Sequence, residues 1–170
     1  MSQTPWFQRT FDFSSEQNIF PSIVERLAGT PVRLEYKLRG LSPEVLTRQV
    51  NGTWSIKENI GHLTDLEPLW QGRLEDILNG APELRPTDLQ NRRTTEAGHN
   101  NKPLEELLRE FTEVRTYTLR LLKEVTEEQV FRSALHPRLK TPMRTMDLFL
   151  FVAEHDDHHL ARITEIITVD

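Results

Sequence analysis

The sequence predicts an all-α fold, a four-helix bundle with long crossover connections. Four segments place apolar residues at the spacing of an amphipathic helix, and no pair of segments shows the strict alternation of paired strands. Two connections, at roughly residues 38–54 and 125–144, are too long for a simple up-and-down bundle of short hairpins. At 170 residues the chain fits one domain (1–170), long enough to bury a core without disulfides.

The composition excludes several classes of function. There is no cysteine, which rules out disulfides, thiolate metal sites and a cysteine nucleophile. The formal net charge is −5 and no basic stripe interleaves with aromatic residues, so we expect no nucleic-acid partner. The longest apolar run, "LFLFVA", is far shorter than the ~20 residues of a membrane span. With no secretory signal at the N-terminus, we expect a cytoplasmic protein without membrane association.

The first half of the chain predicts three helices. The first runs from about Ser15 to Lys37 and is expected to bend or split at Pro31, because proline removes a backbone donor. A short helix follows in "LSPEVLTRQV", closed by Asn51 and Gly52. The next helix begins with a capping box at Ser55, continues through Pro68, where we expect a kink, and ends at Gly80. Its apolar stripe comprises Ile56, Ile60, Leu63, Leu66, Trp70, Leu74 and Ile77.

The second half predicts two long helices and two connections. Residues 81–101 are polar and rich in turn formers, which indicates a long loop. An amphipathic helix follows at 103–125, and a short helical turn begins at Thr126. Residues 131–144 are expected to be irregular or weakly extended, and the last helix spans about Thr145 to Thr168.

The N-terminal arm, residues 1–14, is unusually aromatic for a free terminus. We expect it to pack on the bundle or on a partner subunit, because its apolar side chains are too numerous to remain in water. These side chains are Trp6, Phe7, Phe11 and Phe13.

The last helix contains "AEHDDHHLAR", which holds three of the six histidines. Successive side chains on a helix turn by ~100°, which places His159 inside the apolar stripe and His155 on its edge. These two lie one turn apart, so their imidazoles converge. His158 points toward the polar side of the helix, with Asp157.

A third histidine, His62, lies at the edge of the apolar stripe of the capped helix. If the two helices are neighbours, three imidazoles meet at one point. Three neutral imidazoles with an open fourth position are typical of a catalytic zinc site, and nickel or iron would also be accommodated. The pair His155 and His159 favours a metal, because each buried, unsatisfied ring nitrogen costs on the order of 1–3 kcal/mol. Taken alone, a histidine such as His62 on a helix edge is more often a half-buried histidine bonded to a neighbour. His99 and His136 fall in predicted loops, where we expect surface histidines.

Two other metal templates fit less well. A di-iron carboxylate bundle needs Glu-x-x-His on two helices, whereas Glu154 is followed three residues later by Asp157. "HDDHH" supplies His-Asp-x-x-His in place of the H-E-x-x-H of a zinc protease. Asp156 would then be the base, but aspartate is one methylene shorter than glutamate.

Two motifs carry a resemblance to a known family. They are "WSIKENIGHL" at residues 54–63 and "EHDDHHLARI" at residues 154–163. The order and separation of these two motifs resemble those of the DinB/YfiT-like superfamily, in its DinB_2-type branch. The resemblance covers roughly residues 18–168. The histidine-arginine-glycine-glutamine ending common in that family is absent, because His159 is followed by Leu160.

The resemblance implies a four-helix bundle of unusual topology that holds a divalent metal, commonly zinc or nickel, on His62, His155 and His159. The superfamily includes S-transferases that use low-molecular-weight thiols such as bacillithiol or mycothiol, a mycothiol-dependent maleylpyruvate isomerase, and metal-dependent hydrolases. It therefore implies a metal-dependent enzyme with a small-molecule substrate, activating a thiol cosubstrate or water. It also implies a homodimer.

Three charged residues are candidates for roles around the metal. Asp65 and Asp156 are the nearest carboxylates by sequence and are candidates to orient a ligand imidazole. Arg162 is a candidate to meet a substrate carboxylate. Carboxylates such as Asp65 and Asp156 are more often simply solvated helix charges, and the alternative for Arg162 is an ordinary surface arginine.

Two alternatives to the enzyme stay open. One is a non-catalytic metal-binding helical protein with a structural or sensing role, and the other is a helical interaction module with metal-free histidines. Only three ligands are visible, which favours an open catalytic site over a closed structural one. A rotation of the last helix would let His158 close the site.

Overall fold

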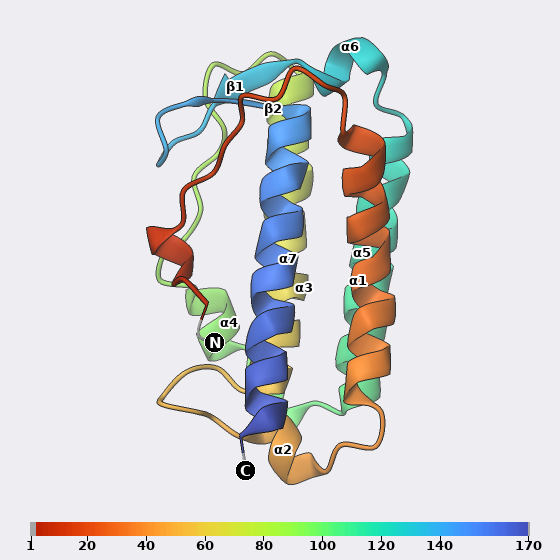
Figure 1. The fold of residues 1–170 in the computed structure, drawn as a ribbon, viewed down its shortest axis with the longest axis vertical. Helices are drawn as coiled ribbons and strands as arrows, with labels where there is room; N and C mark the ends of the chain where they lie inside the picture. The colour runs from red at the N-terminus through yellow and green to blue at the C-terminus, as the bar shows by residue number, and fades with distance from the viewer. Residues whose placement is uncertain (1–2, 170) are drawn as a thin grey trace.

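Four long helices form the body of the molecule. The computed structural model describes residues 3–169, and within them these helices run side by side (Figure 1). They are α1 (Phe20–Leu38), α3 (Ile56–Leu78), α5 (Leu104–Lys123) and α7 (Thr145–Thr168). Both α1 and α3 contact α5 on one side and α7 on the other, so the four close into a ring. The predicted four-helix bundle is confirmed.

The connections contain short elements. These are α2 (Pro43–Thr47), α4 (Arg92–Glu96), α6 (Glu127–Val130), and the 3-10 turns η1 (Trp6–Gln8) and η2 (His99–Asn101). The connection between α5 and α7 also holds an antiparallel hairpin of β1 (Ser133–Leu135) and β2 (Pro142–Arg144), in which Ala134 is paired with Met143. The expectation of no strand pairs was wrong here, because strands of three residues are too short to show an alternating pattern.

Neither internal proline breaks its helix. Helix α1 begins at Phe20, later than the predicted Ser15, and continues through Pro31, while α3 continues through Pro68. Pro68 lies on the exposed face of α3, where water reaches the carbonyl that the missing N–H leaves free. The predicted capping box of α3 is present: Ser55 Oγ accepts from the backbone N–H of Glu58, whose carboxylate accepts from the N–H of Ser55.

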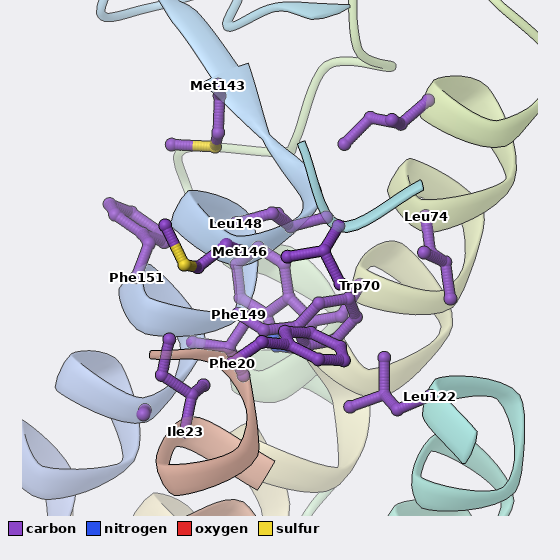
Figure 2. Close-up of a cluster of buried hydrophobic side chains, with 14 of the residues drawn as sticks. Phe20, Ile23, Trp70, Leu74, Leu122, Met143, Met146, Leu148, Phe149 and Phe151 are labelled. Atoms are coloured by element: carbon purple, nitrogen blue, oxygen red, sulfur yellow. The ribbon is translucent and has the colours of Figure 1, made fainter. Parts of the chain in front are cut away.

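The core consists of two hydrophobic clusters with a polar layer between them. The cluster next to the β-hairpin includes Trp70 of α3 and Phe149 of α7 (Figure 2). The other includes Leu34 of α1 and Ile163 of α7. Along each long helix, the apolar positions of the two clusters are separated by about one turn of buried polar residues, which are Thr30, Glu67, Arg115, Thr118, His155, Asp156 and His159. The candidate site therefore lies at mid-height in the bundle.

The N-terminal arm runs beside α7 (Figure 1). Trp6 and Phe11 pack against Phe151 of α7, with ring centroids 5.0 and 4.9 Å from it, and Phe13 stacks on Phe11. Phe7 is 60% exposed. No helix within residues 3–169 has the length and apolar character needed to cross a membrane.

Candidate metal centre

The structure brings His62 of α3 together with His155 and His159 of α7. Each of the three side chains offers one ring nitrogen to a cluster whose members lie within 4.8 Å of one another. All three residues are buried, with at most 5% of their surface exposed. Because α3 and α7 are neighbours in the ring of helices, positions far apart in the sequence meet at one point.

A hydrogen bond fixes the orientation of the His159 ring. Its Nδ1 lies 2.7 Å from Oδ1 of Asn59. The amide nitrogen of Asn59 donates to the carbonyls of Trp54 and Ser55, at 3.1 and 2.7 Å, which leaves Oδ1 as the acceptor. His159 therefore carries its proton on Nδ1 and presents the lone pair of Nε2 to the cluster.

A longer relay fixes the ring of His62. Its Nδ1 lies 3.0 Å from Oγ1 of Thr94, and that hydroxyl donates to Asp65 Oδ2 at 2.9 Å. Thr94 therefore accepts from His62 Nδ1–H, and Nε2 of His62 keeps its lone pair. Nε2 of His99 also lies 2.9 Å from Asp65 Oδ2. Burial would raise the pKa of Asp65, but the hydrogen bonds from His99 and Thr94 outweigh it and lower that pKa.

The third ring, His155, has a buried nitrogen without a hydrogen-bond partner. Its Nδ1 is buried and has no hydrogen-bond partner within the described residues, and its Nε2 lies 3.2 Å from Nε2 of His159. Since the proton of His159 is on Nδ1, two ring nitrogens face each other with at most one proton between them. A divalent ion at this point would accept the lone pairs of both Nε2 atoms.

All three imidazoles are neutral at pH 7. Burial, the largest cause, lowers the pKa of His62 to about 4 and the pKa values of His155 and His159 well below the usual 6.5. The neutral ring is the form that binds metals. Three neutral imidazoles, two with tautomers set by their outer partners, fit a divalent ion such as zinc or nickel.

The three histidines lie in the wall of a pocket of about 590 Å³. The tryptophans Trp6, Trp54 and Trp70 also line it, together with Phe151. The Trp54 ring packs 4.5 Å from His62, and Trp6 packs 4.9 Å from His155. This volume is in the range of small-molecule binding sites.

The structure separates the other predicted residues by role. Asp65 reaches His62 through Thr94, as described above. Asp156 does not orient an imidazole: it turns into the polar layer, where it accepts from Arg115 at 2.6 Å and from Thr30 at 2.7 Å. Arg162 lines the pocket, but its guanidinium is bound to Glu165 and to Thr53.

Two predictions about histidine exposure were wrong. His99 and His136 are 4% and 3% exposed, because the loops that carry them fold against α3. His158 is half-buried under the N-terminal arm, with its Nδ1 3.0 Å from Gln3 Oε1, and it lies outside the three-histidine cluster. Its polar neighbour Asp157 pairs with Arg26 of α1 at 2.6 Å.

Sequence reasoning missed the outer partners. Asn59 precedes His62 by three residues on the same helix face, which is a signal that could have identified it. Thr94 and His99 come from a loop, where helical periodicity places no side chain. His136, which also lines the pocket, lacked a signal for the same reason. Arg73 lies on α3, on the side that carries His62, so helical periodicity could have identified it as it could Asn59.

The comparisons with known proteins agree with this fold. The chain aligns with YfiT from Bacillus subtilis at a TM-score of 0.79 and 22% identity, over 93% of this chain and 91% of that one. YfiT is described as "a probable metal-dependent hydrolase with an unusual four-helix bundle topology". An uncharacterised protein from Clostridium difficile 630 aligns at a TM-score of 0.70 and 10% identity, over 91% and 99% of the two chains. A search of curated proteins found no match.

At these identities the two structures establish a shared fold. The sequence comparison goes further, because the profile of the DinB superfamily matches residues 26–163, which include His62, His155 and His159. The chain belongs to the DinB superfamily.

Proposed function

We propose that this protein is a metal-dependent enzyme in which His62, His155 and His159 hold a divalent ion, zinc or nickel, that activates a small nucleophile. The observation that carries the proposal is the position of the cluster: three neutral ring nitrogens converge in the wall of a pocket large enough for a small-molecule substrate. A divalent ion there would supply a Lewis acid that lowers the pKa of a thiol or of water toward neutrality.

The residues around the cluster serve this function by holding the rings still. Asn59 and Thr94 accept from the outer nitrogens of His159 and His62, so the lone pairs stay aimed at one point. Trp6 and Trp54 cover the rings with apolar surface. A site with low water content strengthens the effect of a positive charge on a bound nucleophile.

Two nucleophiles fit, and they define two candidate reactions. YfiT is described as a metal-dependent hydrolase, and hydrolysis would use water. Transfer to a thiol would need a low-molecular-weight thiol cosubstrate, because the chain contains no cysteine. The pocket has room for more than water, which supports the S-transferase as the second candidate.

The alternative to an enzyme is a non-catalytic protein in which the ion has a purely structural role. Structural zinc sites are usually closed by a fourth protein ligand. Within residues 3–169 the cluster holds three such side chains, and His158 is directed at Gln3 instead. The adjacent pocket supports a fourth coordination position that an exchangeable small molecule would occupy.

Metal content of the untagged protein is the first test, measured by mass spectrometry on the wild type, His155→Ala and His158→Ala. We expect about one ion per chain in the wild type and His158→Ala, and loss of the ion in His155→Ala. Retention in His155→Ala, or an absence of metal after incubation of the wild type with zinc or nickel, contradicts the metal site.

Cobalt substitution then separates the two reactions. Addition of a thiol to the cobalt-loaded protein should change the visible spectrum if a thiol is the nucleophile. If the spectrum responds to pH near neutrality and not to thiol, water is the nucleophile. A spectrum that responds to neither would mean a closed, structural site.

A further inference from the structure

A second buried group in the same pocket lacks a partner. Arg73 of α3 is 2% exposed. Its Nε donates to the carbonyl of Arg85 at 3.1 Å, whereas its Nη2 has no hydrogen-bond partner among the described residues. The nearby carboxylate of Asp76 is bound by the side chain and backbone N–H of Arg85, at 2.7 and 2.8 Å. The other fully buried arginine, Arg115, contacts two carboxylates at 2.6 Å.

The remaining nitrogen of Arg73, Nη1, lies 3.2 Å from Nε2 of His136. The Nδ1 of that ring accepts from the backbone N–H groups of Arg138 and Leu139, at 3.2 and 3.1 Å. Because a backbone N–H can only donate, Nδ1 carries the lone pair. Burial, followed by the charge of Arg73, lowers the pKa of His136 to about 4, so the ring is neutral at pH 7. Its single proton is therefore on Nε2.

Two hydrogen-bond donors consequently face each other. The Nε2–H of His136 and the Nη1–H of Arg73 are both donors, and Nη2 adds another. Burial lowers the pKa of Arg73 to about 10, so the guanidinium is still charged at neutral pH. A buried positive charge with free donors is stabilised by an acceptor that carries negative charge. Both residues line the pocket that contains the three histidines, so an acceptor can enter from that pocket.

Aromatic rings line the pocket between this pair and the histidine cluster. The guanidinium of Arg73 lies 5.6 Å from the ring centre of Trp70, and Trp70 lies 5.9 Å from the ring of His155. Phe151 lies 6.0 Å from His136 and 6.1 Å from Trp70. A ligand that spans the two ends of the pocket would cross apolar surface.

We propose that Arg73 and His136 form a subsite for the carboxylate of a small amphiphilic substrate. The apolar body of that substrate lies on Trp70 and Phe151, and its reactive group reaches the three histidines, a last step that rests on the proposed function. A carboxylate suits the subsite because it carries one negative charge and two oxygens in a plane, which match one guanidinium edge and one imidazole N–H.

Binding of matched probes tests the subsite without any reaction. Phenylacetate and phenylacetamide share an apolar body and differ in charge. Their dissociation constants are measured by calorimetry on the protein as purified and after removal of metal. We expect phenylacetate to bind about 10- to 100-fold more tightly than phenylacetamide in both forms, because hydrogen bonds to charged groups are the strong ones. Equal affinities overturn the proposal.

Three variants locate the effect. The preference for phenylacetate should disappear in Arg73→Met and persist in Arg162→Met, whose arginine lines the same pocket but is bound to Glu165. The preference should also persist in His155→Ala. If it is lost in His155→Ala and kept in Arg73→Met, the carboxylate binds the metal and the subsite is rejected. Phenyl phosphate binding more tightly than phenylacetate would overturn the choice of a carboxylate.

A measurement on the wild type guards against a variant that fails to fold. In nitrogen-labelled protein, the Nε2–H signal of His136 should shift on addition of phenylacetate and stay in place with phenylacetamide. An unchanged signal at saturating phenylacetate rejects the subsite. The two proposals also fail separately. If metal-free protein prefers phenylacetate while metal-loaded protein shows no activity, the carboxylate subsite is kept and the metal-dependent enzyme is rejected.

Discussion

The guanidinium of Arg115 on α5 lies 2.6 Å from the carboxylate of Asp156 on α7, and each side chain is about 1% exposed. Glu67 of α3 accepts from the same guanidinium at 2.6 Å, and Thr30 of α1 donates to Asp156. One buried cation and two buried anions thus connect all four long helices, one residue away from His155. This polar layer holds α7 at a fixed rotation and therefore aims its histidines.

Arg115→Met should destabilise the fold strongly. It leaves two buried carboxylates without the cation that they share, and removal of one partner of a buried ion pair costs about 3–5 kcal/mol of unfolding free energy. Asp156→Asn should cost less, because the amide oxygen still accepts from Arg115 and one buried negative charge is removed. Urea unfolding checks both. The exposed Arg120→Met is the matched control and should stay within about 0.5 kcal/mol of the wild type. A larger loss for Asp156→Asn than for Arg115→Met would contradict this explanation.

Thr94→Val should weaken metal binding without removing a ligand. The substitution keeps the side-chain shape but deletes the oxygen that accepts from His62 Nδ1, and loss of such an outer partner typically costs 10- to 100-fold in affinity. Competition with a chelator measures the effect. Thr95→Val, an exposed change on the same short helix, should leave the affinity unchanged. Equal affinities in all three proteins would show that the relay to Asp65 has no role.

Ser55→Ala should lower the unfolding free energy by about 1–2 kcal/mol, because the hydroxyl caps α3. The same hydroxyl donates to Asn100 Oδ1 at 2.6 Å, which adds to the loss. Ser42→Ala is a matched control, since Ser42 precedes α2 without a side-chain capping bond. Thermal or urea unfolding should rank Ser55→Ala well below Ser42→Ala in stability; the reverse order would contradict the capping argument.

Nickel should quench the intrinsic fluorescence of the protein. All three tryptophans line the pocket, and the rings of Trp54 and Trp6 lie 4.5 and 4.9 Å from His62 and His155. An open-shell ion at this distance offers the excited indole a non-radiative route, whereas zinc does not. Titration of metal-free protein with each ion tests this, with His155→Ala as the unresponsive control. Unquenched emission from protein that contains nickel by mass spectrometry would place the ion elsewhere.

The helices and the histidine cluster were predictable because their signals are local. Apolar spacing and the capping box at Ser55 define α3 from its own sequence, and the one-turn separation of His155 and His159 defines a shared helix face. His155 and His159 could then meet His62 if α3 and α7 were neighbours. Assignment of the three as ligands, the homodimer and the cytoplasmic location stay predictions.

The remaining features depend on contacts between distant segments. His136 is buried because a hairpin of three-residue strands folds onto α3, and such short strands have no periodicity to detect. Asp156 occupies a helix position that looks polar, yet its partner Arg115 comes from another helix whose pattern appears purely amphipathic. The covering of His158 depends on Gln3 and Arg9 of the N-terminal arm. In each case tertiary packing decides what the local pattern leaves open.

The placement of the three histidines on two helices also has a thermodynamic consequence. An unfolded chain rarely brings His62 close to His155, so an ion that binds all three histidines binds the native state almost exclusively. At a free ion concentration of 100 times its dissociation constant, such linkage adds about 2.7 kcal/mol to the unfolding free energy. The melting temperature would then rise with metal supply, and the lifetime of the protein in a cell would follow the availability of the ion.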